Sequence, residues 1–254
     1  MRQVSVEASI RAPDGLTNVY IAGDAVLVDP GAESADLRET LRRTEPSHVA
    51  TTHHHPDHTG AVAPYAEEFG LTVWARAGRT DAFEAATGIS PDRTFGPGDE
   101  LPAGNIEVLD TPGHAPEHVA FVTDEGIISG DIAVAEGSVV VGAPEGDMRA
   151  YLTSLRRLHA RGPERLFPGH GPAIDDPRAT CQRLLAHRLD RERAVERAVE
   201  QGETTPDALV DAVYEKDISD VRALARATVV AHLEKLAVEG RITWDGTTAL
   251  PAAD

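Results

Sequence analysis

The sequence predicts an α+β protein in which helices cover two packed β-sheets and a small helical domain follows. Up to about residue 175, short β-type runs and turns alternate with helical patches. Beyond that point, long amphipathic stretches rich in Ala, Arg, Glu and Leu replace the β-type runs. We therefore expect a larger domain at residues 1–175, a linking helix at 176–201 and a small C-terminal domain at 202–254.

The strands and helices of the larger domain follow from hydrophobic periodicity and turn residues. The expected strands are Val4–Val6, Val19–Ile21, Val26–Val28, Val49–Thr52, Leu71–Ala75, Ile106–Leu109, Val119–Val122 and Ile127–Ser129. The expected helices are Ser34–Arg43, Val62–Phe69, Gly78–Ala86 and Asp147–His159. Many short strands interleaved with helices fit two packed sheets with the helices outside.

The C-terminal part begins with an amphipathic helix, expected at Arg178–Glu200. Thr205-Pro206-Asp207 combines a capping residue with a proline and opens the next helix. Asp220–Glu239 has apolar residues at helical spacing, and Arg241–Leu250 contains the turn signal of a hairpin. Helix, helix and hairpin in this order predict a winged-helix-like domain.

The charge balance is strongly acidic. The net charge is −18, with 42 acidic residues against 24 basic ones, and Lys216 and Lys235 are the only lysines. This composition is typical of proteins from salt-accumulating halophiles, although an acidic protein of a high-GC organism is the alternative. No apolar run reaches the ~18 residues of a membrane span, and no signal-peptide core opens the sequence. We expect a cytoplasmic protein without membrane contact, in which Cys181 is a buried helix residue.

The halophilic interpretation predicts that salt stabilises the fold, because salt screens the repulsion between like charges. The midpoint of thermal unfolding is expected to be higher in ~2 M than in ~0.1 M potassium chloride. An unchanged or lower midpoint at high salt would contradict halophilic adaptation.

The segment His53–His58 concentrates metal-binding side chains directly after an expected strand. If the alternation of Val49–Thr52 continues, His53 and His55 point to one side and His54 points to the other. His54 is therefore expected to be structural or exposed. A solvated loop or a tag-like histidine run is disfavoured, because Pro-Asp interrupts the histidines.

Asp57 and His58 follow Pro56, which turns the chain and brings both side chains toward the same place. Neutral imidazoles with a carboxylate and no cysteine suit zinc, with manganese and iron as alternatives. Three later motifs again place a ligand-type residue beside glycine and after a strand. They are Thr111-Pro112-Gly113-His114, Ser129-Gly130-Asp131 and Pro168-Gly169-His170-Gly171.

In this order, the four motifs resemble those of the metallo-β-lactamase superfamily, outside its antibiotic-degrading branch. The likeness covers residues 17–175 and implies an αββα sandwich with two zinc ions. It implies that one zinc is held by three histidines, that the second is held by an aspartate and two histidines, and that a further aspartate bridges them. These residues are His53, His55 and His114; Asp57, His58 and His170; and Asp131, respectively.

Within the superfamily the sequence is most similar to the group of lactamase-beta-like protein 2 and glyoxalase II. Pro168–Pro172, the pair His187-Arg188 and the run from Ala231 to Ile242 carry this likeness. The resemblance implies a zinc hydrolase in which a hydroxide bridging the two metals attacks the substrate, with Asp57 helping to orient it.

Two substrate classes compete for this hydrolase: a small ester or thioester, and single-stranded RNA cut by an endoribonuclease. The acidic surface favours the ester or thioester, because a nuclease needs a cationic groove for phosphates. A third interpretation is a DNA-binding regulator that uses Arg222 and Arg226. Residues 202–254 carry ten acidic residues against five Lys or Arg, which disfavours that interpretation. Docking of this domain on the active-site rim, or on a second subunit in a homodimer, is expected instead.

The remaining histidines have less specific contexts. His118 is expected either to orient a metal ligand or to pack in a strand. His187 is expected either to approach the site or to pack on a helix. His48, His159 and His232 are interpreted as structural, and the charged stretch Arg188–Glu200 as a solvated helix face.

Overall fold

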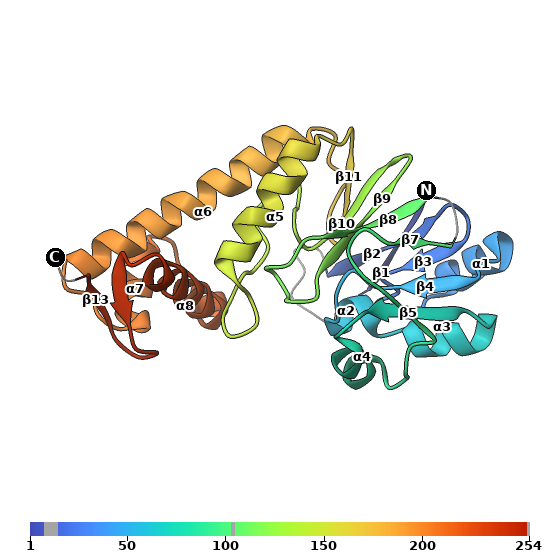
Figure 1. Cartoon of the computed structure of the whole chain (residues 1–254), viewed down its shortest axis with the longest axis horizontal. Helices are drawn as coiled ribbons and strands as arrows, with labels where there is room; N and C mark the ends of the chain where they lie inside the picture. Colours follow the sequence, from blue (N-terminus) through green and yellow to red (C-terminus); the bar gives the residue numbers. More distant parts are fainter. Residues whose placement is uncertain (8–14, 103–104, 253–254) are drawn as a thin grey trace.

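The two sheets of the protein are seen in a computed structural model that describes residues 1–7, 15–102 and 105–252. One sheet has six strands, in spatial order β1 (Arg2–Glu7), β2 (Leu16–Ala22), β3 (Val26–Val28), β4 (His48–Ala50), β5 (Thr72–Arg76) and β6 (Arg93–Phe95). The other has five strands, in spatial order β11 (Leu166–Pro168), β10 (Gly126–Gly130), β9 (Val119–Thr123), β8 (Ile106–Asp110) and β7 (Glu100–Leu101). The two sheets lie side by side in Figure 1.

Helices complete the outer layers of the sandwich (Figure 1). The first sheet is accompanied by α1 (Ala35–Thr44), α2 (Pro56–Thr59), α3 (Val62–Phe69) and α4 (Thr80–Thr87). The second sheet packs against α5 (Met148–Arg161) and the start of α6 (Pro177–Glu200). The expected α+β fold with an αββα sandwich is confirmed.

Side-chain alternation in the strands creates the layers. In β2, Val19 and Ile21 face the helices α1 and α3, whereas Tyr20 and Ala22 face the second sheet. Because successive residues of a strand point to opposite faces, a sheet covered on both sides is apolar on both. One apolar core layer therefore lies between the two sheets and another lies between the first sheet and its helices. Polar groups are accommodated in the loops at one end of the sandwich.

Some elements differ from those expected. The strand β4 ends at Ala50 rather than Thr52, so His53 and His55 lie in the following loop. The strands β6 and β7 were not predicted, because segments of two or three residues are too short to show alternation. Pro13-Asp14-Gly15 has the composition of a turn, but this segment lies mostly outside the described residues.

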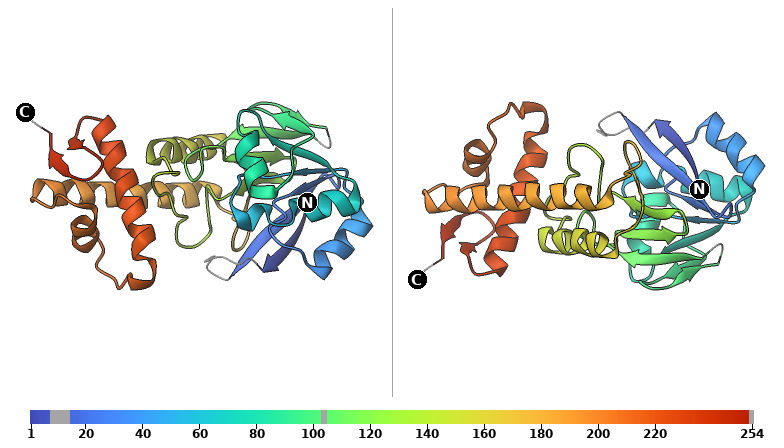
Figure 2. Two further views of the ribbon diagram at one scale, coloured as in Figure 1. Left: turned by 90° about the horizontal axis from the view of Figure 1, so that it is seen from below. Right: turned by 90° about the horizontal axis from the view of Figure 1, so that it is seen from above.

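The C-terminal module consists of α7 (Pro206–Val213), the 3-10 helix η1 (Ser219–Val221), α8 (Arg222–Val238), and the hairpin of β12 (Ile242–Trp244) and β13 (Ala249–Pro251). The long helix α6 runs from the sandwich to this module, and α8 lies across it in both views of Figure 2. The last turns of α6 contribute Val195 and Val199 to the core of the module. Among the described helices, none is both long and apolar enough to cross a membrane.

The interpretation of Arg188–Glu200 as a solvated helix face is wrong at Arg188 and Glu192, which are both buried. The reason is that α6 is covered from two sides, by the sandwich at its start and by α8 near its end. Arg188 donates a hydrogen bond to the carbonyl oxygen of Val139, and Glu192 forms an ion pair of 2.8 Å with Lys235. Cys181 on the same helix is buried, as expected.

Glu192 is expected to stabilise the junction between α6 and the module. Its carboxylate accepts hydrogen bonds from Lys235 and Arg241, both at 2.8–2.9 Å, and lies 3.7 Å from the ring of His232. Burial by itself raises the pKa of Glu192, but the His232 ring together with the cations of Lys235 and Arg241 outweighs it and lowers the pKa to about 2. Its charged form is therefore favoured in the folded protein.

We expect Glu192→Gln to lower the free energy of unfolding by about 3 kcal/mol, because the Lys235 and Arg241 charges lose their buried partner. A folded-state pKa below the unfolded one means that this contribution is complete above about pH 5 and disappears as the pH falls toward 2. Urea unfolding across this pH range measures the difference. Glu200→Gln, at an exposed position of the same helix, is the control and is expected to change stability by less than ~0.5 kcal/mol.

Candidate metal centre

The seven ligand candidates lie together at one end of the sandwich, although they come from four separate segments. His53 and His55 follow β4, and Asp57 and His58 belong to the short helix α2. The other three candidates lie in the segments after β8, β10 and β11; they are His114, Asp131 and His170, respectively. The donor atoms form three groups that share residues, and within each group all donor atoms lie within 4.8 Å of one another. These groups are His53, His55 and His114; His53, His58 and Asp131; and Asp57, His58 and His170.

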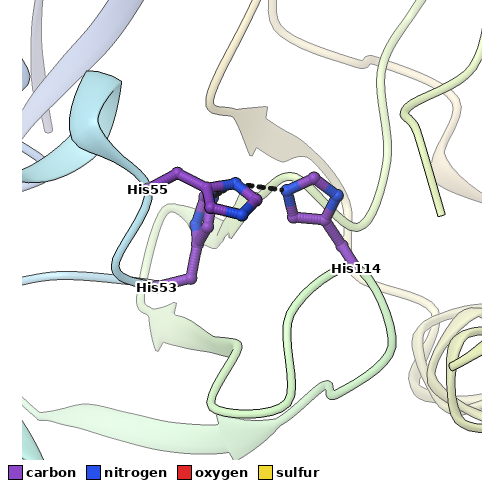
Figure 3. A group of neighbouring side chains, drawn as sticks. All are labelled: His53, His55 and His114. Carbon is purple, nitrogen blue, oxygen red and sulfur yellow. Dashed lines mark hydrogen bonds between the residues drawn. The ribbon is translucent and has the colours of Figure 1, made fainter. Parts of the chain in front are cut away.

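The first group is made of three imidazoles that converge in Figure 3. His53 Nε2 lies 3.1 Å from His55 Nδ1, and His114 Nε2 lies 2.9 Å from the same atom. His53 is buried, whereas His55 is half-buried and borders a cavity. Three nitrogens thus face a common point beside open space.

The second and third groups contain one carboxylate each, Asp131 and Asp57, and lie next to the first. His170 Nε2 is 3.2 Å from Asp57 Oδ2 and 3.4 Å from Asp131 Oδ2. Asp131 also lies 3.7 Å from His114 Nε2 and 3.6 Å from His58 Nε2. The Asp131 carboxylate therefore lies between His114 of the first group and the two histidines of the third group.

Each of the five histidines is held at its other ring nitrogen by a hydrogen-bond acceptor. The acceptors are Thr52 Oγ1 for His53 (3.0 Å), Glu145 for His55 (3.1 Å), Asp29 for His58 (3.0 Å), the Val140 carbonyl for His114 (2.7 Å) and the Leu16 carbonyl for His170 (2.8 Å). A ring nitrogen that donates there keeps the proton, so the nitrogen facing the cluster carries a lone pair. Lone pairs that face one another at about 3 Å repel unless a cation lies among them.

Two further observations fit a divalent cation at this place. Among the described residues, His58 Nε2 and Asp131 Oδ1 are buried polar atoms without a hydrogen-bond partner. Burial by itself lowers the pKa of His170, but Asp131 and Asp57 outweigh it and raise the pKa to about 10. The carboxylates thus attract positive charge to this point. Five imidazole nitrogens with two carboxylates form a donor set that suits zinc or iron.

Glycines allow the backbone to approach the cluster. A Cβ at Gly169 would lie 2.4 Å from Asp131 Oδ1 and 2.6 Å from His58 Cε1. Gly130 adopts a positive φ of 47°, and a Cβ there would lie 2.7 Å from His118 Nε2. A side chain at Gly169 would therefore displace the ligand candidates Asp131 and His58, and one at Gly130 would displace the neighbouring His118.

His118 orients the bridging candidate Asp131. Its Nε2 accepts a hydrogen bond of 3.0 Å from the Asp131 backbone N–H, and its Nδ1 donates one of 2.9 Å to Thr111 Oγ1. Burial lowers the pKa of His118 to about 3, together with the neighbouring His114, so the ring remains a neutral acceptor. Of the two interpretations of His118, the structure therefore supports the one in which it positions a ligand.

His54 lies outside the three donor groups, and its ring contacts Phe83 with 5.5 Å between centroids. The backbone N–H of His54 donates to the buried Glu117, which fixes the loop between the metal-facing histidines. His187 is exposed, and it does not line the cavity beside the cluster. Its neighbour Arg188 is the residue that contacts the cavity wall, through its hydrogen bond to the carbonyl oxygen of Val139.

A cavity of about 630 Å³ opens beside the cluster. Its floor contains His55, Asp57, His114, Asp131 and His170, and its walls come from the loop 134–145 and from α8. The walls are mainly apolar, and Glu136 and Glu145 supply the charged side chains. Among the described residues that line this cavity there is no lysine or arginine.

Sequence reasoning missed several residues of the site. Asp29 is not among the site residues predicted from the sequence, yet it is fully buried and accepts hydrogen bonds from His58 and Thr52. The turn sequence Asp29-Pro30-Gly31 is the local signal that the sequence offers for Asp29. In the structure, the positive φ of 55° at Asp29 shows that its backbone conformation is unusual. For Glu145 and for Leu224 of α8 no such signal exists, because only the folded chain brings them to the cavity.

The candidate recognition helix of the DNA-binding interpretation is α8, and its arginines are already paired. Arg222 lies 2.5 Å from Asp211, and Arg226 lies 3.3 Å from Asp207, both within the module. Another face of α8 lines the cavity through Leu224 and Ala227. The geometry therefore joins the module to the candidate metal centre.

Two family models match the chain. Residues 12–170 match the description "Metallo-beta-lactamase superfamily", and residues 205–249 match "Beta-lactamase associated winged helix domain". A Drosophila melanogaster protein named "Beta-lactamase-like protein 2 homolog" is 30% identical over 249 residues, which cover 89% of this chain and 84% of that protein. An Aspergillus novofumigatus protein named "Atrochrysone carboxyl ACP thioesterase nsrC" is 29% identical, covering 90% of this chain and 76% of that protein.

Solved structures share the fold. A beta-lactamase domain protein from Burkholderia ambifaria superposes with a TM-score of 0.83 at 22% identity, covering 99% of this chain and 91% of that one. A second crystal structure, described as a di-iron-bound form, has a TM-score of 0.57 at 32% identity and covers 69% of this chain and 94% of that one.

Proposed function

This chain belongs to the metallo-beta-lactamase superfamily and is a hydrolase of that superfamily, and we propose that it is a dinuclear zinc enzyme acting on small acyl esters or thioesters. The observation that carries the proposal is the set of three overlapping donor groups at the floor of a cavity whose described lining has no lysine or arginine. The donors leave one side open to the cavity, whereas a purely structural zinc would be enclosed by four protein ligands.

We assign His53, His55 and His114 to one zinc, Asp57, His58 and His170 to the other, and Asp131 to both. Two ions held by these residues would supply Lewis-acid chemistry, which polarises a carbonyl oxygen and lowers the pKa of water toward neutrality. The carboxylates of Asp57 and Asp131 supply the negative charge that retains the ions in a buried site. Asp57, which borders the cavity, orients the attacking water toward the substrate carbonyl.

A thioester or ester is favoured over RNA by the charge of the cavity. A groove for a single-stranded nucleic acid carries lysine or arginine along the phosphate path. Here the charged wall residues are Glu136 and Glu145, and the whole chain has a net charge of −18. The relatives named as thioesterases support the same choice. The DNA-binding alternative is not proposed, because Arg222 and Arg226 are paired within the module.

The proposal extends to the organisation of the chain. Residues 1–175 form the catalytic domain, residues 176–201 the linking helix, and residues 202–254 the module that completes the cavity wall. We further propose that the protein works in a cytoplasm with a high salt concentration, since the excess of acidic residues suits that environment.

The substrate class is tested with metal-loaded protein and two kinds of substrate. A neutral hexanoyl thioester of N-acetylcysteamine and end-labelled single-stranded RNA are incubated separately with the enzyme. Thiol release is expected only from the thioester, and it is expected to stop when a chelator removes the metal. Cleavage of the RNA without thiol release would overturn the proposed substrate class. Metal analysis of protein purified at high salt decides between zinc, manganese and iron.

A further inference from the structure

We propose that the acyl chain of the substrate lies between the loop 134–145 and helix α8, so that the C-terminal module selects the acyl group. This inference rests on the proposed hydrolysis of an acyl ester or thioester. It assigns a substrate-binding role to the winged-helix module and identifies Leu224 as the residue of that module that determines specificity.

The two walls of the cavity present apolar side chains. Val139 and Val140 belong to the loop wall, and Leu224 and Ala227 belong to the α8 wall. Val140 is 38% exposed and Leu224 is 37% exposed, which places them among the few large apolar side chains in contact with water. Because both border the cavity, a hydrocarbon chain bound there would remove their surface from water.

The apolar wall begins directly at the metal centre. His114 Nδ1 donates a hydrogen bond of 2.7 Å to the carbonyl oxygen of Val140, so Val140 itself contacts a candidate metal ligand. A carbonyl carbon positioned at the metals would therefore carry its attached chain along this wall. The polar floor and the apolar wall form one continuous cavity.

The module is joined tightly to the loop that forms the other wall. The Ala143 N–H donates a hydrogen bond of 3.1 Å to the Ala227 carbonyl of α8. A Cβ at Gly142 would lie 2.8 Å from the Ala227 Cβ, so the two backbones are in close contact. The loop 134–145 of the larger domain and α8 of the module are therefore in direct contact at the backbone, with no large side chain between them.

Arginines of α6 hold the same loop from behind. Arg183 donates hydrogen bonds to the carbonyl oxygens of Val134, Ala135 and Gly137, at 2.6–2.9 Å. Arg188 donates to the carbonyl oxygen of Val139. These bonds fix the loop before a ligand binds, and a preformed wall loses little conformational entropy on binding.

An acyl chain matches this wall better than the thiol half of a thioester. The thiols of common biological thioesters carry amides, carboxylates or phosphates, which gain nothing from valine and leucine side chains. Anionic thiols would also meet Glu136 and Glu145. A hydrocarbon acyl chain avoids both penalties, and a cavity of about 630 Å³ is within the usual size range of small-molecule sites.

The test compares acetyl, butanoyl, hexanoyl and octanoyl thioesters of N-acetylcysteamine, so that the leaving group is constant and neutral. Each methylene that becomes buried is expected to raise kcat/KM about fourfold, until the cavity is filled. Leu224→Asp is expected to lower the ratio of hexanoyl to acetyl kcat/KM at least tenfold. Val238→Asp, at a 66% exposed position of the same helix outside the cavity, is the matched control and is expected to leave the ratio within twofold.

Binding without turnover separates this inference from the proposed reaction. Isothermal titration of metal-loaded protein with hexanoate and acetate compares two ligands that share one carboxylate. Hexanoate is expected to bind at least tenfold more tightly, and Leu224→Asp is expected to abolish this preference. Thioester hydrolysis with no dependence on chain length would overturn the inference and leave the reaction supported. Chain-length-dependent binding with no thioester hydrolysis would overturn the reaction and leave the apolar site supported.

Discussion

Asp131→Ala is expected to lower bound metal below two ions per chain and to reduce kcat/KM for a thioester at least ~1000-fold. The physical reason is position: the Asp131 carboxylate lies 3.4–3.7 Å from nitrogens of His58, His114 and His170. Removing it takes away the anionic donor that we assign to both metal ions and leaves the three histidines with less negative charge to retain a cation. Metal analysis after dialysis, with rates measured on the same samples, gives the result.

The matched control for this experiment is His54→Ala, in the same histidine run. Its ring contacts Phe83 and lies outside the donor groups, so the variant is expected to keep its metal and most of its activity. His55→Ala is expected to behave like Asp131→Ala. If His54→Ala lost metal as completely as His55→Ala, the assignment of these histidines would be wrong.

Asp29→Asn is expected to weaken metal binding roughly 10- to 100-fold while the fold is retained. Asp29 Oδ2 accepts the proton of His58 Nδ1 and also the hydroxyl of Thr52, which in turn holds His53. An amide has a single carbonyl oxygen and no charge, so it cannot accept these two bonds and also the 2.6 Å bond that Asp29 Oδ1 accepts from the Thr52 backbone N–H. Competition with a chromophoric chelator measures the affinity.

Asp24→Asn is the control for Asp29→Asn, because the two aspartates have nearly the same positive φ. Asp24 has a φ of 54° and Asp29 a φ of 55°, and asparagine tolerates this region as well as aspartate does. Asp24 lies at the surface and pairs with Arg2. A metal affinity of Asp29→Asn within twofold of that of Asp24→Asn would contradict the role given to Asp29.

Much of the sandwich could be predicted because its strands are apolar on both faces. Val19 and Tyr20, for example, belong to different core layers, and such runs are recognisable without a structure. Short strands such as β6 and β7 could not be predicted, since their pairing depends on neighbours far along the chain. The burial of Arg188 and Glu192 escaped prediction for the same reason.

The ligand candidates could be predicted because each stands in a short motif with glycine or proline, at a place where a strand gives way to a loop. Residues that act on the ligands were harder to find. Glu145 is 90 positions from His55, and Leu224 reaches the cavity only through the packing of α8 on the loop 134–145. Such contacts are made by tertiary packing, and no local pattern in the sequence indicates them.

The most direct test of a dinuclear thioester hydrolase is an activity titration of metal-free protein with zinc. Protein stripped with a chelator is mixed with zero to three equivalents of zinc, and thiol release from hexanoyl-N-acetylcysteamine is followed at each ratio. Because we assign the ligands to two adjacent metal sites that share Asp131, activity is expected to rise until about two equivalents and then remain constant. Full activity at one equivalent, or no thiol release at any ratio, would contradict the proposal.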